Sequence, residues 1–252
     1  MEFFDCNVSY GIETAHLPLQ PVHTAAELCR EMRNAGVAKA VVFRAEQYAA
    51  CPSYGNQLVA EDVSEHLQLF GLWALLPAHT DEIPAPDQMI AAMKRHKIIG
   101  FRLFPEGLKF MARVFVLRDW LELAVMHQIP IFINIAHGCS FNELADLLEA
   151  YPELTVVLTD PDVWPGDRMQ RPFISHFPNV YLDLSYAITD GGIESFVRKY
   201  GSRRLLYGSD FPRGYFGSNM LMIKQAKLSD TDKENIASGN LKRIVRGVIY
   251  DQ

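Results

Sequence analysis

The sequence predicts an α/β protein that folds as a single (β/α)8 TIM-like barrel. Eight short apolar segments alternate with amphipathic segments along the chain, and repeated β-then-α units of this number are typical of the barrel. Several of these segments are apolar throughout, as strands covered on both faces must be. The length of 252 residues fits one such domain, which we expect to span residues 1–252.

The strands are predicted from the apolar runs. Residues 69–76 run into Pro77 and residues 98–104 (IIGFRLF) stop at Pro105, because proline cannot continue the pairing of a central strand. The last run, 205–207, is short and leads directly into Gly-Ser-Asp. The eight predicted strands are 3–8, 38–43, 69–76, 98–104, 130–135, 154–159, 180–184 and 205–207.

The helices are predicted from amphipathic spacing and from capping residues. Thr24 with Glu27, and Ser140 with Glu143, have the spacing of a capping box, and Gly36 ends the first helix. The predicted helices are 25–34, 55–66, 87–96, 115–127, 141–149, 168–176, 193–200, 218–227, 231–238 and 241–248. A doubly wound open sheet is the alternative fold, but no glycine-rich phosphate-binding motif follows the first strand.

Composition and charge exclude several classes of function. The net charge is −6 and no run of Lys and Arg is present, so we expect no nucleic-acid partner. The longest apolar runs are strand-length, which is too short to cross a bilayer, so we expect no membrane partner. The N-terminus, MEFFDCNVSYG, lacks the basic and apolar regions of a secretory signal. These features predict a cytoplasmic protein.

The four cysteines give no motif of their own. Cys6, Cys29, Cys51 and Cys139 are far apart and none belongs to a CxxC pair, which argues against a disulfide framework or a thiolate zinc site. Cys139 has only His137 as a potential base, and Ser209 lies in Gly-Ser-Asp instead of a G-x-S-x-G elbow. A thiol or serine nucleophile is therefore not expected.

Polar residues gather where the predicted strands end, and in a parallel barrel the site lies at those carboxyl ends. Alternation along the first strand places Asp5, Asn7 and Ser9 on one side, so they could face one cavity. The remaining candidates at strand ends are Arg44, Glu46, Arg102, Asn134, His137, Asp160, Asp162, Asp183, Ser185, Ser209 and Asp210. An Asp beside Arg and His suits proton transfer or metal binding.

Structural roles are the alternative at several of these positions. Asp160 precedes Pro161 and could simply shape a turn. Arg102 could pair with a strand-end carboxylate to fill the barrel, and His137 could cap its strand. The sequence leaves these alternatives open.

The segment 205–212, LLYGSDFP, resembles the eighth-strand signature of the amidohydrolase-related family of metal-dependent hydrolases, which also includes decarboxylases. Other segments of the chain occur in the order and spacing of that family. They are IIGFRLFP, IPIFIN, YPELTVVLTD, NVYLDLS and ENIASGNLKRI. The resemblance implies a barrel whose eighth-strand aspartate, here Asp210, accepts a proton from water.

The same resemblance implies metal-ligand positions that this chain fills with other residue types. The family's D-x-H-x-H motif is here Asp5-Cys6-Asn7-Val8-Ser9, the fifth-strand histidine falls on Asn134, and the sixth-strand histidine falls on Asp160. Neutral Asn and Ser oxygens bind zinc poorly. Asp160 and Asp210 remain the candidates for holding a divalent metal, with Asn134 and Asn7 oxygens beside them, so both a single metal such as zinc and a metal-free site stay open.

Two hypotheses for the function follow. In the first, the chain is a hydrolase or a decarboxylase acting on a small carboxylate-bearing molecule, with Asp210 as general base and His137 polarising or protonating the substrate. Arg102 would anchor the carboxylate bidentately, with Asn134 and Asn7 as further substrate-binding residues. In the second, it is a metal-free relative that binds a small ligand, has lost catalysis, or transfers protons with Asp210, Asp160 and His137 alone. A purely structural role ranks last, because the strand ends are polar. By analogy with the family we also expect a homodimer.

Overall fold

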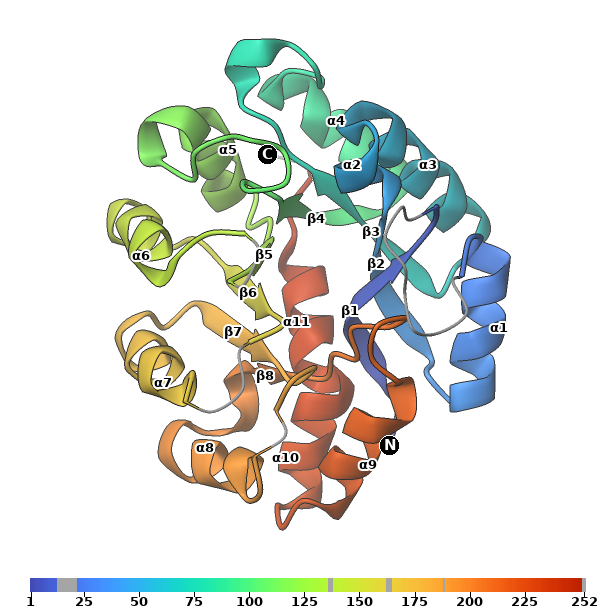
Figure 1. The fold of residues 1–252 in the computed structure, drawn as a ribbon, viewed down its shortest axis with the longest axis vertical. Helices are drawn as coiled ribbons and strands as arrows, with labels where there is room; N and C mark the ends of the chain where they lie inside the picture. Colours follow the sequence, from blue (N-terminus) through green and yellow to red (C-terminus); the bar gives the residue numbers. More distant parts are fainter. Residues whose placement is uncertain (13–21, 136–137, 162–164, 188, 251–252) are drawn as a thin grey trace.

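The computed structural model is a (β/α)8 barrel, which confirms the fold predicted from the sequence. It describes residues 1–12, 22–135, 138–161, 165–187 and 189–250. Eight parallel strands follow one another around the sheet in chain order, and helices surround them (Figure 1). The strands are β1 Phe4–Tyr10, β2 Lys39–Arg44, β3 Leu69–Ala74, β4 Ile98–Leu103, β5 Ile131–Asn134, β6 Val156–Thr159, β7 Val180–Asp183 and β8 Leu205–Leu206.

The ring is completed where the chain beyond β8 meets β1. The strand β8 has only two residues, but the backbone after it continues to pair. The Cys6 amide donates to the Tyr207 carbonyl at 2.9 Å, and the Ser9 amide donates to the Phe211 carbonyl at 2.8 Å. The segment that carries the Gly-Ser-Asp sequence is therefore held against β1.

The helices agree with the prediction to within a few residues, with two differences. A short helix at Glu46–Ala49, α2, was not predicted. The two helices predicted at 231–238 and 241–248 form one continuous helical segment, because a π-helical turn at Asn235–Gly239 joins them. The helices are α1 Ala25–Ala35, α2 Glu46–Ala49, α3 Pro52–Glu65, α4 Pro86–His96, α5 Val114–Met126, α6 Phe141–Ala150, α7 Asp167–His176, α8 Gly192–Tyr200, α9 Phe216–Gln225, α10 Asp230–Glu234 and α11 Asn240–Gly247, with 3-10 turns at Ala78–Thr80 and Ser202–Arg204.

None of these helices has both the length and the apolar character that crossing a membrane needs. The helix α11 instead lies across the middle of the ring of strands (Figure 1). Its Leu241 and Ile244 pack into the apolar cluster inside the barrel. That cluster also contains Phe4, Cys6, Val41, Phe43, Leu72, Ile99, Phe132, Val157 and Leu206. One end of the barrel is thus plugged by hydrophobic burial, which leaves the other end for polar groups.

The strand β1 does not alternate as predicted. Phe4 and Cys6 belong to the inner cluster, whereas Val8 and Tyr10 belong to the outer core between strands and helices. The pairing of β1 with β2 shifts register between Asp5 and Val8, as a β-bulge requires. The prediction that Asp5 shares one side with Asn7 and Ser9 was therefore wrong, because the extra residue of the bulge reverses the alternation.

We expect Asn240→Ala to destabilise the fold by about 2–3 kcal/mol, since its fully buried amide donates to two carbonyls that would lose their partner. The amide bonds the carbonyls of Ser202 and Leu205, both at 2.7 Å. Urea denaturation followed by circular dichroism measures the effect.

The matched control is Asn179→Ala. Its amide also donates to a carbonyl, that of Pro152 at 3.0 Å, but in a solvent-exposed position where water replaces the lost bond. It should change the free energy of unfolding by no more than about 0.5 kcal/mol. Equal effects of the two substitutions would show that Asn240 does not anchor α11.

Candidate active site

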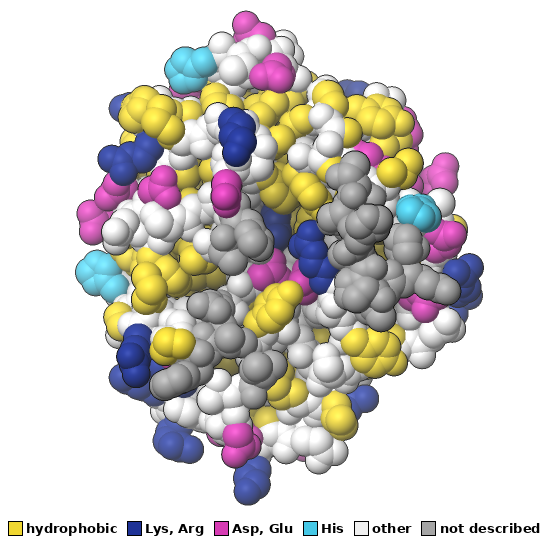
Figure 2. All heavy atoms as spheres, in the orientation of Figure 1, with side chains coloured by type: hydrophobic (Ala, Val, Ile, Leu, Met, Phe, Trp, Pro, Cys, Tyr) yellow, Lys and Arg dark blue, Asp and Glu magenta, His cyan; other side chains and the backbone are white. Residues whose placement is uncertain are grey.

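The carboxyl ends of the strands meet in a polar hollow. Figure 2 shows acidic and basic side chains together at the bottom of a depression in the middle of this face. The polar side chains that the structure buries at these ends include Asp5, Asn7, Ser9, Arg102, Asp160, Asp183, Ser209 and Asp210. They come from strands that are far apart in the sequence, so only closure of the barrel brings them together.

Asn7 links two carboxyl groups at the centre of this hollow. Its Nδ2 donates to Oδ1 of Asp160 at 2.6 Å and to Oδ2 of Asp183 at 3.0 Å. Asn134 donates to the other oxygen of Asp160, also at 2.6 Å. Ser185 adds a hydroxyl that lies within hydrogen-bond distance of both carboxyl groups. Two amides and a hydroxyl therefore hold this pair of acids in place.

Arg102 supplies the positive charge of the cluster. Its side chain is 3% exposed, its Nη1 lies 3.4 Å from Oδ1 of Asn7, and its Nη2 lies 3.7 Å from Oδ2 of Asp160. The guanidinium stacks over the ring of Phe43 at 4.5 Å and over that of Phe104 at 5.8 Å. Its Nε has no hydrogen-bond partner among the described residues. The guanidinium therefore keeps hydrogen-bonding capacity that the described residues do not use.

Asp210 follows β8 and lies close enough to Asp160 and Arg102 for their charges to act on it. Its Oδ2 accepts a hydrogen bond from the Tyr186 hydroxyl at 2.7 Å. Asp210 and Asp160 both have left-handed backbone conformations, with φ of 53° and 51°. Aspartate adopts this region more readily than most residues, yet the conformation still costs energy. A strained backbone at both of these strand-end aspartates favours a functional role for each.

The Gly-Ser-Asp sequence is shaped by its neighbours. A Cβ on Gly208 would lie 2.9 Å from Oδ2 of Asp183, so a side chain there would push that carboxyl group away. The backbone amide of Ser209 donates to Oδ1 of Asp5 at 3.1 Å. The same oxygen accepts the amide of Asn7 at 3.0 Å. Asp5 is thus a brace that joins the bulge of β1 to the end of β8 and so positions Asp210.

The carboxyl groups of Asp5, Asp160, Asp183 and Asp210 share this buried region with the guanidinium of Arg102. Three of them have raised pKa values. Burial raises the pKa of Asp5 to about 7. Burial, and then the negative charge of Asp160, raise the pKa of Asp183 well above its usual value. The same two causes raise the pKa of Asp210 to about 7, while the Tyr186 hydrogen bond and nearby arginines oppose them. Near neutral pH, Asp210 can therefore both accept and give up a proton.

A cavity of about 380 Å³ opens beside this cluster. Arg102 and Asn134 form part of its wall, so the cavity reaches the residues that hold Asp160. The remaining lining residues are Phe43, Tyr48, Leu103, Phe104, Glu106, Gly107, Lys109, Gly138 and Arg213. Three aromatic rings and three cations face one acidic residue. The volume and the composition suit a small, flat, negatively charged molecule.

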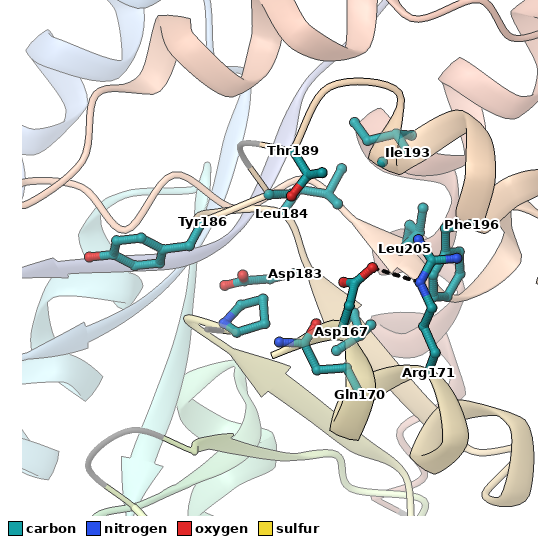
Figure 3. A pocket seen from close by; sticks show the side chains of 14 residues that line it. Asp167, Gln170, Arg171, Asp183, Leu184, Tyr186, Thr189, Ile193, Phe196 and Leu205 are labelled. Carbon is teal, nitrogen blue, oxygen red and sulfur yellow. Dashed lines mark hydrogen bonds and ion pairs between the residues drawn. The ribbon is translucent and has the colours of Figure 1, made fainter. Parts of the chain in front are cut away.

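A second, smaller cavity of about 60 Å³ lies behind β7, between α7 and α8. Figure 3 shows that Asp183 and Tyr186 lie on the side away from the ion pair of Arg171 with Asp167, which has a nitrogen–oxygen distance of 2.7 Å. The space is large enough for only a few water molecules. Asp183 thus separates this small cavity from the polar cluster.

The structure brings together most of the residues proposed from the sequence. Asn7, Arg102, Asn134, Asp160 and Asp210 all belong to the cluster or to the cavity wall. His137 and Asp162 lie outside the described residues, so the roles proposed for them stay predictions. Arg44 does not reach the cavity.

Arg44 and Glu46 instead brace the barrel rim. Arg44 forms ion pairs with Glu46 at 2.8 Å and with Asp62 at 2.7 Å. Tyr48, in α2, does line the cavity. The segment after β4 contributes Phe104, Glu106 and Gly107 to the cavity wall.

Sequence analysis missed several residues of the site. Tyr186 lies next to Ser185 in the polar end of the seventh predicted strand, but nothing in the pattern connects it with Asp210. Asn219 in α9 donates to the Gly208 carbonyl at 2.6 Å and to the Ser185 carbonyl at 3.3 Å, which ties the loops after β7 and β8 together. Phe43 and Phe104 read as ordinary core residues. For these, only the fold provides the signal.

The described residues do not fit a zinc ion. No three His, Cys, Asp or Glu side chains among them are grouped so that they could hold a metal. At the positions where the resemblance implies ligands, Asn7 and Asn134 turn their NH2 groups toward Asp160, not their oxygens. An amide nitrogen that donates hydrogen bonds offers no lone pair to a metal.

Comparison with protein families identifies the chain. The Amidohydrolase family matches residues 14–247, so the protein belongs to the amidohydrolase family, as the LLYGSDFP segment predicted. A search of curated proteins finds no match to the chain.

Solved structures share the fold at low sequence identity. A probable 2-pyrone-4,6-dicarboxylic acid hydrolase from Acinetobacter baumannii, with citric acid bound, is 16% identical over 98% of this chain and 100% of its own, with a TM-score of 0.70. A 2,6-dihydroxybenzoate decarboxylase from Rhizobium is 10% identical over 97% of this chain and 98% of its own, with a TM-score of 0.72. A dihydroxybenzoic acid decarboxylase from Polaromonas, with manganese and 2-nitroresorcinol bound, is 13% identical over 97% of both chains, with a TM-score of 0.69.

We expect stability to fall as pH rises from about 4 to about 7, in part because Asp5 keeps its proton in the folded state but loses it in the unfolded chain. Its pKa is about 7 in the fold against 3.8 as a free side chain. Asp5→Asn cannot titrate and keeps the oxygen that accepts two amides. The pH slope of its free energy of unfolding should therefore be shallower than that of the wild type, by up to about 1.4 kcal/mol per pH unit.

Urea denaturation at a series of pH values between 4.5 and 7.5 measures this slope. Asp190→Asn, at an exposed position, is the control and should keep the slope of the wild type. If Asp5→Asn has the wild-type slope as well, Asp5 is not protonated in the fold.

Proposed function

We propose that the protein is a hydrolase that opens a small cyclic molecule bearing a carboxylate, with Arg102 as the anchor for that carboxylate and Asp210 as the general base. The observation that carries the proposal is the buried guanidinium of Arg102, which forms part of the wall of a cavity of about 380 Å³. A carboxylate in the cavity would pair with the positive charge of this side chain.

The walls of the cavity support a ring-shaped substrate. Phe43, Tyr48 and Phe104 provide flat apolar surfaces, and Lys109 and Arg213 add positive charge at the same cavity. Such a combination selects a planar anion over a neutral or a cationic molecule. The relatives named above support the same substrate class, since their names refer to hydroxybenzoates and to a pyrone dicarboxylate.

The charge on Arg102 favours hydrolysis over loss of the anchored carboxylate. Decarboxylation turns a carboxylate into neutral CO2, so a tight ion pair stabilises the starting state more than the transition state. A carboxylate bound to Arg102 is therefore retained, and the reaction takes place elsewhere on the ring. Hydrolysis of a cyclic ester needs one group that accepts a proton from water and returns it to the leaving oxygen.

Asp210 is suited to that proton transfer. In its ionised form it removes a proton from water, whose oxygen attacks the ester carbonyl, and the carbon–oxygen bond of the ring then breaks. The proton passes from Asp210 to the leaving oxygen, which restores the ionised carboxylate. Tyr186, bonded to Oδ2 at 2.7 Å, keeps the carboxyl group oriented. Arg213 lines the cavity and would offset negative charge that develops on the carbonyl oxygen.

Arg102→Met should weaken the binding of benzoate by about 10-fold to 100-fold, which corresponds to the loss of a hydrogen bond to a charged group. Isothermal titration calorimetry measures the affinity, with benzamide as the neutral isostere that should bind weakly to both proteins. Arg203→Met, at an exposed position, is the matched control and should bind benzoate as the wild type does. Equal affinity of the wild type for benzoate and benzamide would remove Arg102 as the anchor.

The hydrolase proposal is tested with carboxylated 2-pyrones, whose ring opening changes the ultraviolet absorbance. Asp210→Asn keeps the shape of the side chain and an acceptor for Tyr186, but it should lower kcat by at least about 100-fold because the base is lost. In the wild type, kcat/KM should rise with pH through about 7, where Asp210 ionises.

Tyr186→Phe provides the second arm of this test. It removes a hydrogen bond that lowers the pKa of Asp210, so the rise in kcat/KM should move to higher pH. Asp190→Asn is the control for the aspartate substitution and should retain full activity. Release of CO2 from dihydroxybenzoates without ring opening of pyrones would replace hydrolysis by decarboxylation. Binding of these ligands without turnover would mean that the chain has lost catalysis.

A further inference from the structure

We propose that this centre works without a resident metal ion, because the amide of Asn7 and the guanidinium of Arg102 occupy the place that a divalent cation would take between Asp160 and Asp183. The proposal rests on contacts within the cluster and does not depend on which substrate the protein uses. It also goes beyond the observation that zinc does not fit, since it assigns the role of the cation to two named side chains.

The first argument is that protein donors already occupy the carboxyl oxygens. Oδ1 of Asp160 accepts from Asn7 at 2.6 Å and from Ser185 at 3.2 Å, and its Oδ2 accepts from Asn134 at 2.6 Å. Oδ2 of Asp183 accepts from Asn7 at 3.0 Å, and its Oδ1 accepts from the amide of Ser185 at 3.0 Å. A metal would have to displace these donors before it could bind either acid.

The second argument is the orientation of the Asn7 amide. Its Nδ2 lies between two carboxyl oxygens, and its Oδ1 faces a guanidinium nitrogen of Arg102 at 3.4 Å. Turning the amide around would place its oxygen against the carboxyl groups and its NH2 group against the cation. The NH2 group against Arg102 and the oxygen against Asp160 would both be repulsive contacts, so these two neighbours hold the amide in the orientation that cannot bind a metal.

The third argument is electrostatic. Arg102 carries a permanent positive charge 3.7 Å from Asp160, and its side chain is 3% exposed. A guanidinium stays charged at any pH at which the protein is folded. It therefore neutralises Asp160 in the way a cation would, and a second cation placed beside it would be repelled. The same side chain lines the cavity, where its charge can attract an anionic ligand.

Metal analysis of the natively purified protein tests the proposal without any substrate. Mass spectrometry with inductively coupled plasma should find less than about 0.1 equivalents of zinc, manganese or iron for each chain after dialysis. The melting temperature should stay unchanged when EDTA, ZnCl2 or MnCl2 is added. About one equivalent of metal that survives dialysis in the wild type and is lost in Asp160→Asn would overturn the proposal.

A gain-of-binding variant tests the role of Asn7 itself. Asn7→Asp exchanges the donor NH2 for an oxygen, so three carboxyl groups would meet where the amide now lies. This variant should bind Mn2+, with a melting temperature that rises by several degrees in its presence and with a titratable site by calorimetry. Asn179→Asp makes the same chemical change at a solvent-exposed position and should show no such shift.

The two experiments test different parts of the proposal. A folded Asn7→Asp protein that does not bind Mn2+ would show that Asn7 is not what excludes the metal. If the variant does not fold, the metal content of the wild type still decides the proposal. Neither measurement uses turnover, so the hydrolase proposal can fail while the metal-free centre stands, and the reverse also holds.

Discussion

The structure depends on how one buried guanidinium and a set of amides balance four buried carboxyl groups. Burial makes the charged form of each acid costly, and Arg102 can offset only part of the negative charge. The remaining acids respond by keeping protons, as the raised pKa values of Asp5, Asp183 and Asp210 indicate. Because negative charge exceeds positive charge in the cluster, Asp5 and Asp210 have pKa values of about 7 and can exchange protons near neutral pH. The excess of negative charge also explains why so many hydrogen-bond donors converge on Asp160.

The barrel supplies the rigidity that such a cluster needs. The plug formed by α11 fills one end with apolar side chains, so the polar groups at the other end rest on a packed interior. Asp5 joins the bulge of β1 to the backbone after β8, and Asn219 ties the loops after β7 and β8. These braces never touch the cavity, yet they determine where Asp210 points. A small displacement of either would separate Asp210 from Tyr186.

Membership of the amidohydrolase family and the electrostatics of this chain point to different means of stabilising negative charge. The family fold brings strand ends together around a common centre, and a manganese ion is bound in the Polaromonas relative. Here amide hydrogens and a guanidinium lie at that centre. The guanidinium of Arg102 lies over the rings of Phe43 and Phe104, so charge and flat apolar surface meet at the cavity wall. Under the proposals made above, the same architecture would use a different source of positive charge.

The sequence by itself determined the order of strands and helices, the family, and which residues lie at the strand ends, because hydrophobic periodicity, capping residues and the LLYGSDFP segment are local signals. The tertiary structure alone decided which of those residues meet. The bulge in β1 moved Asp5 out of the row it was expected to share with Asn7, since one extra residue reverses every side chain after it. Tyr186 and Asp210 are 24 positions apart. No short-range pattern encodes their hydrogen bond, which exists only because the barrel closes.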